Sequence, residues 1–120
     1  KYLHGYLLYA KLWFGCEQLD ENNWVVDFGS FKEIVSSLED TFDHKTCIAA
    51  NDPDLKIFKS MHKKNIIDLV VFEEGVGIEM FTEYVFNEID KFIKNKTRGR
   101  CWVVKCEVWE HSTNSAIYKK

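Results

Sequence analysis

The chain has 120 residues and a mass of 14.2 kDa, the size of a single domain spanning 1–120. Hydrophobic residues make up 46% and charged residues 29%, with one proline and six glycines, which excludes disordered, collagen-like and low-complexity classes. The net charge of −3 argues against a general affinity for nucleic acid. No stretch reaches the roughly 18 apolar residues of a membrane span. The first residues lack the pattern of a signal peptide. We therefore expect a cytoplasmic protein that binds neither nucleic acid nor membrane.

Aromatic residues are frequent in this chain and bear on its assembly. They make up 15% of the sequence, with nine Phe, five Tyr and four Trp. This is a large share for one small core, and aromatic side chains are enriched where protein surfaces meet. The composition therefore indicates that apolar surface is used in subunit contacts as well as in the core.

The four cysteines, Cys16, Cys47, Cys101 and Cys106, are scattered without the CxxC spacing of metal or redox motifs. We interpret them as reduced structural thiols of a cytosolic protein.

The first third of the chain predicts a β-hairpin. Residues 6–14 alternate between two faces, as in a strand. Residues 19–23 are polar and predict a turn, and residues 24–28 predict a short second strand.

Helices are expected in the middle of the chain. Gly29 ends the second strand, and Ser30 with Glu33 matches a capping box. Apolar residues at helical spacing then predict an amphipathic helix over 31–41, and 43–51 is expected to be irregular. Asp52 and Pro53 resemble a helix cap and a first helical position, which predicts a short helix ending near residue 64.

The last half of the chain predicts two strands and a long helix. The strands are expected over 66–72 and 100–109, and the helix over 78–94. In the last strand, alternation puts four residues on one face: Trp102, Val104, Cys106 and Val108. About four strands and two apolar helices predict an α+β layer, an antiparallel sheet with helices on one face.

Three places in the sequence could carry chemistry. His4 could be a zinc ligand, although a lone histidine is more often an ordinary surface or core residue. Asp43 could orient His44 and raise its basicity, but adjacent loop residues need not face each other. Glu110, near the end of the last strand, could accept two hydrogen bonds from an amidine-like ligand edge, or could simply end the strand.

Four separated segments together resemble one enzyme family. They are Leu3-His4-Gly5, the block LDENNWVVDFG at 19–29, Asp43-His44, and Val108-Trp109-Glu110 followed by Ala116 and Tyr118. In order and spacing they are similar to the 6-pyruvoyl-tetrahydropterin synthase and 6-carboxytetrahydropterin synthase family over nearly the whole chain. The block at 19–29, followed by a helix, is the most specific element.

The resemblance implies the tunnelling fold, an antiparallel four-stranded sheet with two helices on one face. Three subunits would close their sheets into a β-barrel, and two such trimers would stack into a hexamer. A homo-trimer or homo-hexamer would account for the aromatic excess.

The resemblance also implies a chemistry. Enzymes of this family act on dihydroneopterin triphosphate, where a zinc ion held by three histidines acidifies a C–H bond. A cysteine thiolate, assisted by an Asp-His pair, moves the protons. By this resemblance Asp43 and His44 are the catalytic pair, Glu110 binds the pterin ring and Glu79 is a further pterin contact. His4 is one member of a partial metal site.

The sequence departs from the family pattern at the metal and thiol positions. His-Gly-His is His4-Gly5-Tyr6 here, and a phenol with its usual pKa near 10 is a poor ligand. The family's first strand, a further zinc histidine and the catalytic cysteine all precede this motif, which begins at the fourth residue here. We therefore expect this chain, as given, to lack that strand and that thiol, and to bind zinc weakly or not at all. Two interpretations are open: an N-terminally shortened copy of an active enzyme, or a divergent member of the family. His111 also stands where the family usually has threonine.

Three functions are compatible with these residues. The leading one is a tetrahydropterin-synthase-like lyase, in the 6-carboxytetrahydropterin branch that feeds 7-deazaguanine (queuosine) synthesis. The second is a non-catalytic oligomer that binds pterins or purines and has lost the zinc and the thiol. The third is another tunnelling-fold enzyme, such as an aldolase or a cyclohydrolase of the pterin pathway.

Overall fold

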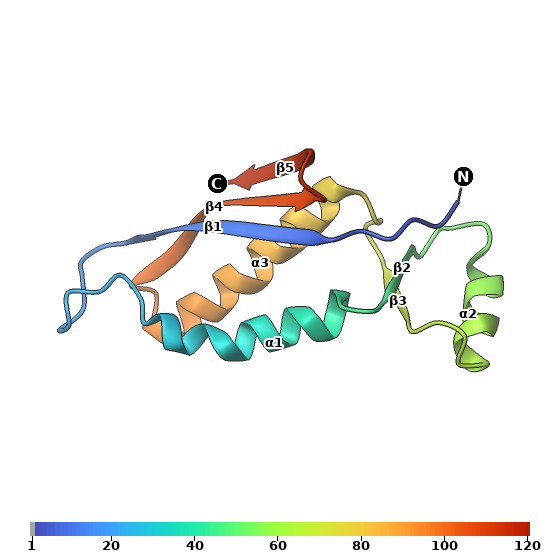
Figure 1. Ribbon diagram of the computed structural model, residues 1–120. Coiled ribbons are helices and arrows are strands. Elements are labelled where there is room, and N and C mark those ends of the chain that lie inside the picture. Colours follow the sequence, from blue (N-terminus) through green and yellow to red (C-terminus); the bar gives the residue numbers. More distant parts are fainter. Residues whose placement is uncertain (1) are drawn as a thin grey trace.

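The computed structural model describes residues 2–120 and has an α+β architecture (Figure 1). In chain order its elements are β1 (Leu8–Cys16), the 3₁₀-helix η1 (Phe28–Ser30), α1 (Phe31–Phe42), β2 (Thr46–Ala49), α2 (Leu55–Lys63), β3 (Leu69–Phe72), α3 (Ile78–Thr97), β4 (Cys101–Glu110) and β5 (Asn114–Lys119). None of the helices in the described part of the chain combines the length and apolar character that crossing a bilayer requires.

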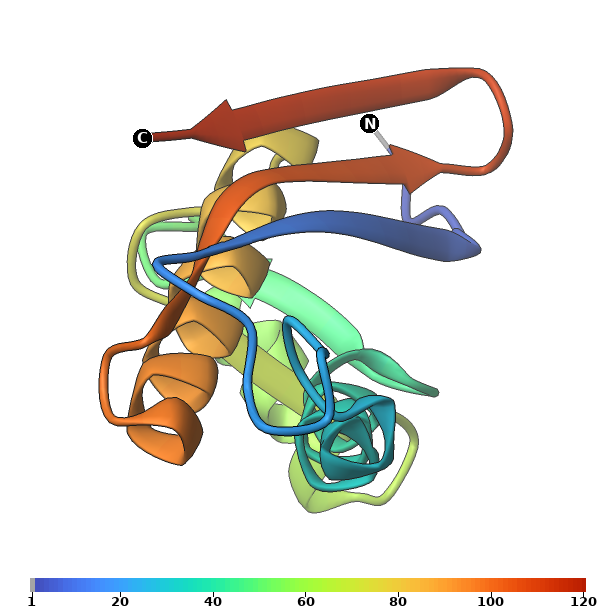
Figure 2. The ribbon, with the colours of Figure 1, turned by 90° about the vertical axis from the view of Figure 1, so that its left-hand side faces the viewer.

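The main sheet is antiparallel and has three strands in the order β1-β4-β5. Helices α1 and α3 both lie on one side of it, with α3 directly beneath the strands (Figure 2). The α+β layer with two helices on one face is therefore confirmed. The expected four-stranded sheet and its closure into a barrel are not confirmed: within residues 2–120 this sheet has three strands, and β2 and β3 form a separate two-stranded parallel sheet.

The small sheet arises from a segment that was expected to be irregular. Residues Thr46–Ala49 form β2 and pair in register with Leu69–Phe72 of β3, and α2 provides the crossover between these parallel strands. An ion pair between Lys45 and Asp68 lies at the start of both strands. Four residues are too few to establish a period, which explains why the sequence pattern did not indicate β2.

The predicted hairpin between residues 6–14 and 24–28 is wrong. β1 pairs with β4 instead, and residues 24–27 are not in a strand. The carbonyl of Val25 accepts hydrogen bonds from the Arg100 guanidinium at 2.8 Å and from the Cys101 thiol at 2.7 Å. Side chains therefore occupy an acceptor that a hairpin ladder would have used. Val26, next to it, is buried in the core.

The two faces of β4 also differ from the prediction, because the strand contains a β-bulge. Trp13 is opposite Lys105 but Phe14 is opposite Val103, so Val104 is an extra residue. The bulge reverses the alternation, and Trp102 and Val104 do not share a face with Cys106. The residues buried toward the helices are Cys101, Val103, Cys106 and Val108.

A buried carboxylate in α3 supports this bulge. Asp90 is only 8% exposed, and its Oδ1 accepts the Val103 N–H at 2.9 Å. Its Oδ2 accepts from the Lys94 ammonium at 2.7 Å. The carboxylate thus satisfies a strand N–H at the irregular position in the ladder.

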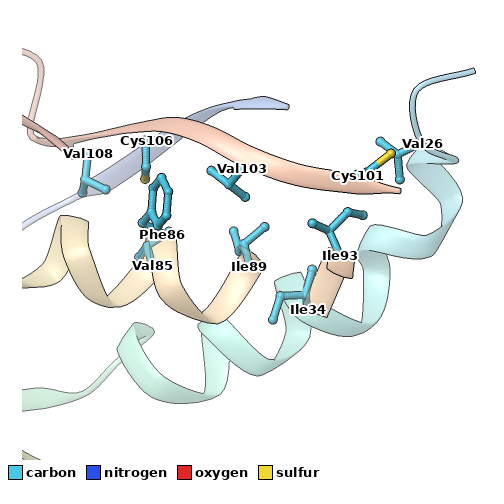
Figure 3. Close-up of a cluster of buried hydrophobic side chains, with 10 residues drawn as sticks. All are labelled: Val26, Ile34, Val85, Phe86, Ile89, Ile93, Cys101, Val103, Cys106 and Val108. Carbon is cyan, nitrogen blue, oxygen red and sulfur yellow. The ribbon is translucent and has the colours of Figure 1, made fainter. Parts of the chain in front are cut away.

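The core lies between α3 and the inner face of β4, with a contribution from α1. Figure 3 shows side chains of α3, such as Phe86 and Ile89, directed toward Cys106 and Val103 of β4. The Tyr118 ring on β5 extends the core by packing edge-on against Phe86, at 4.9 Å between ring centroids. The sequence pattern did not indicate β5, a six-residue edge strand that follows directly on the turn after β4.

The helices lie where the periodicity predicted them, but their caps differ. α3 continues three residues beyond 94, to Thr97, and its C-cap Arg98 adopts φ +53°. The expected capping box does not form, since Ser30 makes no side-chain cap hydrogen bond and its hydroxyl donates to the Asp27 carbonyl. α2 begins at Leu55 rather than Pro53, because Asp52 accepts the Asp54 N–H in a preceding turn.

Candidate functional site

The N-terminal segment lies against the turn that follows β4. The His111 N–H donates to the Leu7 carbonyl at 2.8 Å, which ties the two segments together. The Tyr6 ring is close to two imidazoles, with its centroid 5.2 Å from that of His111 and 6.3 Å from that of His4. Tyr6, the residue that replaces the second histidine of the pattern, is therefore at the centre of an exposed aromatic cluster.

Glu110 is the last residue of β4 and stands next to this cluster. It is paired with Leu8 on one side and Asn114 on the other, and it is half-buried. Because side chains alternate along a strand, Glu110 lies on the same face of β4 as the buried Cys106 and Val108, which is the face toward the helices. None of the ion pairs formed within residues 2–120 uses its carboxylate.

Glu107 lies on the opposite face of the same strand. Its Oε2 accepts the Ser115 hydroxyl at 2.8 Å from the neighbouring strand β5. The two glutamates of β4 therefore differ in both face and partner, and Glu107 is a matched control for Glu110.

The Asp43-His44 pair follows α1. His44 Nε2 lies 3.7 Å from Asp43 Oδ1, and the side chains are 93% and 60% exposed respectively. His44 adopts φ +56°. Both views show the end of α1 well below the end of β4 (Figures 1 and 2). A single subunit therefore does not bring Asp43 and His44 to Glu110.

Glu79 lies in the first turn of α3, at a position where a negative charge is favoured by the helix dipole. Its side chain is exposed. Its Oε1 lies close to Gly77, at 3.0 Å from the position that a Cβ atom would take on that glycine. The local structure thus gives Glu79 a role at the helix end, independent of any ligand.

The donor set for a metal is incomplete within one subunit. Across residues 2–120 no three His, Cys, Asp or Glu side chains are grouped so that they could hold a metal ion. His4 has Tyr6 as its nearest aromatic neighbour, and a neutral phenol does not replace an imidazole ligand. Residues 2–120 thus place one imidazole, His4, beside Tyr6 at this position, and we assign no reaction step to a metal.

Three of the four thiols are poor nucleophiles near neutral pH. Burial raises the pKa of Cys106 to about 11 and also raises the pKa of Cys47. Burial is likewise the main cause that raises the pKa of Cys101. Since only the thiolate attacks, burial weakens these three cysteines as nucleophiles.

Sequence reasoning missed Arg100, which positions the most family-specific block of the chain. Its guanidinium donates to the carbonyls of Gln18 and Val25, both at 2.8 Å. No periodicity distinguishes such an arginine, because its partners are backbone carbonyls more than seventy residues away.

Comparisons with known proteins agree with this architecture. The family model for 6-pyruvoyl tetrahydropterin synthase matches residues 1–120. The 6-carboxy-5,6,7,8-tetrahydropterin synthase of Aquifex aeolicus is 27% identical over 120 residues, covering 98% of this chain and 74% of the relative.

Two solved structures have the same fold. One is a catalytic-residue mutant of Plasmodium vivax 6-pyruvoyltetrahydropterin synthase, with a TM-score of 0.70 and 17% identity over 100% of this chain and 82% of that one. The other is an uncharacterized protein from Wolinella succinogenes, with a TM-score of 0.69 and 12% identity. That match covers 98% of this chain and 99% of the other. Since the family model covers the whole chain, this protein belongs to the 6-pyruvoyl tetrahydropterin synthase family.

Proposed function

We propose that this protein is a tetrahydropterin-synthase-like lyase that acts on dihydroneopterin triphosphate, in the 6-carboxytetrahydropterin branch of 7-deazaguanine (queuosine) synthesis. The family model over the full chain supports the reaction class, and the name of the Aquifex aeolicus relative favours the carboxy branch. The observation that carries the proposal is Glu110, a half-buried carboxylate at a strand end that none of the ion pairs within residues 2–120 uses.

Glu110 is suited to recognise a pterin. The pterin ring presents an N–H and an exocyclic amine side by side, and these match the two oxygens of one carboxylate. A charge-assisted pair of this kind is strong and directional when water is excluded. The adjacent Tyr6–His111 aromatic cluster offers ring faces near the same strand end.

The proposed active state is a homo-trimer or homo-hexamer. β1 and β5 are the two free edges of the sheet, and free edges pair readily with other strands. The outer face beside them carries exposed apolar residues, including Tyr9 at 55% and Ile117 at 53%. Because Asp43 and His44 lie away from Glu110 within one subunit, we propose that a neighbouring subunit completes the site.

A specific observation favours the non-catalytic alternative, an oligomer that binds pterins or purines. The metal position offers His4 beside Tyr6, and burial disfavours the thiolates of Cys47, Cys101 and Cys106. These departures favour binding without chemistry, and they leave Glu110 in place.

Incubating the protein with dihydroneopterin triphosphate and zinc, in parallel with a neopterin titration, separates the two functions. Turnover together with binding supports the lyase, and binding without turnover supports the alternative. If neopterin does not bind, both proposals are wrong. The proposed location is the cytoplasm, where reduced thiols persist.

A further inference from the structure

Two of the four cysteines lie opposite each other on neighbouring strands. Cys16, the last residue of β1, is in register with Cys101, the first residue of β4. The Glu17 N–H donates to the Arg100 carbonyl at 3.2 Å, while the Cys101 N–H donates to Thr97 Oγ1 at 3.0 Å rather than to Cys16. This pattern identifies a non-hydrogen-bonded antiparallel pair, in which the two Cα atoms are ~4.5 Å apart.

The two side chains point to the same side of the sheet. Cys101 is part of the buried core, and Cys16 packs against that core. The pKa of Cys101 is raised, and burial is the main cause. The charge of Arg100 acts in the opposite direction, and the neighbouring Cys16 thiol raises the pKa further. A disulfide requires Cα atoms separated by about 4.4–6.8 Å, and this register satisfies that requirement without a change in strand pairing.

No other pair among the four cysteines has this arrangement. Cys106 is five residues further along β4, on the order of 16 Å from Cys101 at the usual rise of a strand. Cys47 lies on β2, in the other sheet.

We propose that Cys16 and Cys101 form a reversible redox site, which a low-molecular-weight disulfide converts into an intramolecular disulfide. Cys16 is partly accessible and Cys101 is fully buried, so the external reagent meets Cys16 first. The Cys16 thiolate attacks one sulfur of the external disulfide, and the other sulfur leaves as a thiolate that takes up the proton lost by Cys16. The Cys101 thiol then loses its proton, attacks the Cys16 sulfur and releases the second external thiol. Two protein thiols are oxidised and one external disulfide is reduced to two thiols.

Oxidation has a structural consequence at Val25. The Cys101 S–H donates to the Val25 carbonyl at 2.7 Å, and Arg100 donates to the same carbonyl. A disulfide has no S–H, so oxidation removes one of these two donors. Amide hydrogen exchange in residues 18–28 should therefore become faster in the oxidised protein, while exchange in α3 stays unchanged.

The test uses the full chain, reduced and then equilibrated with mixtures of reduced and oxidised glutathione. Free thiols are trapped by alkylation in denaturant, and the protein is weighed and digested. We expect the oxidised wild type to lose the mass of two hydrogens, to alkylate two of its four cysteines, and to yield a peptide that joins Cys16 to Cys101. Cys47→Ser should behave in the same way. Cys101→Ser should stop with one glutathione bound to Cys16.

Two results would overturn the proposal. One is four alkylated thiols at every glutathione ratio. The other is a cross-link that maps to other cysteines or joins two chains. If Cys101→Ser fails to fold, the peptide map of the wild type decides the question alone.

Discussion

Replacing the buried Asp90 tests how α3 supports the sheet. Asp90→Ala removes the acceptor for the Val103 N–H at the bulge and the partner of Lys94. Leaving a buried N–H without an acceptor costs ~1–3 kcal/mol. The Lys94 ammonium is half exposed, so losing its ion pair adds at most about 1 kcal/mol. We therefore expect Asp90→Ala to lower the free energy of unfolding by about 1–4 kcal/mol in total.

Two further variants separate the components of this effect. Asp90→Asn retains a side-chain oxygen for the Val103 N–H and should cost less than Asp90→Ala. Glu33→Gln removes the exposed contact with Lys96, whose N–O distance is 3.5 Å, and should change stability by less than about 1 kcal/mol. Urea unfolding of the three variants, followed by circular dichroism, measures these differences. Equal losses for Asp90→Ala and Glu33→Gln would refute the role given to the Val103 hydrogen bond.

Three other predictions concern assembly, metal and packing. Light scattering at micromolar concentration should give the mass of a trimer or a hexamer, and a monomer would contradict the role assigned to the free edges. Metal analysis after dialysis should find far less than one zinc per subunit, because His4 has Tyr6 where a second histidine is needed; stoichiometric zinc would require ligands from elsewhere. Gly15→Ala should destabilise the protein by about 1–3 kcal/mol in urea unfolding, since its Cβ would lie 2.8 Å from Trp102 Nε1; wild-type stability would show that Trp102 can move.

The long periodic segments of the sequence were sufficient to predict α1, α3 and β4. Twenty helical residues in α3 and ten strand residues in β4 repeat their patterns often enough to identify the type of each element, although the bulge changes which β4 residues face the core. The four-residue β2 shows no such repetition. No local sequence pattern identifies β4 as the partner of β1. The polar turn at 19–23 is compatible with a hairpin but does not require one.

Two other differences have specific physical causes. The bulge at Val104 lies next to a hydrogen bond from the Val103 N–H to Asp90, thirteen residues away, and strict alternation cannot reveal it. In the candidate site, residue type and position pointed to Glu110 and Asp43-His44, and the resemblance gave them roles. The family pattern contains all three residues but does not say how far apart they lie in one subunit. That distance depends on how α1 and β4 are placed in the fold.

The most direct test of the pterin-binding proposal is a neopterin titration of Glu110→Gln beside Glu107→Gln. Glutamine replaces one acceptor with a donor that faces a donor of the pterin, and each unpaired group costs ~1–3 kcal/mol. Binding should therefore weaken by about tenfold to a thousandfold, at ~1.4 kcal/mol per decade. Glu107 lies on the opposite face of β4, so Glu107→Gln should bind like the wild type. Equal affinities for the two variants would remove Glu110 from the site and contradict the proposal.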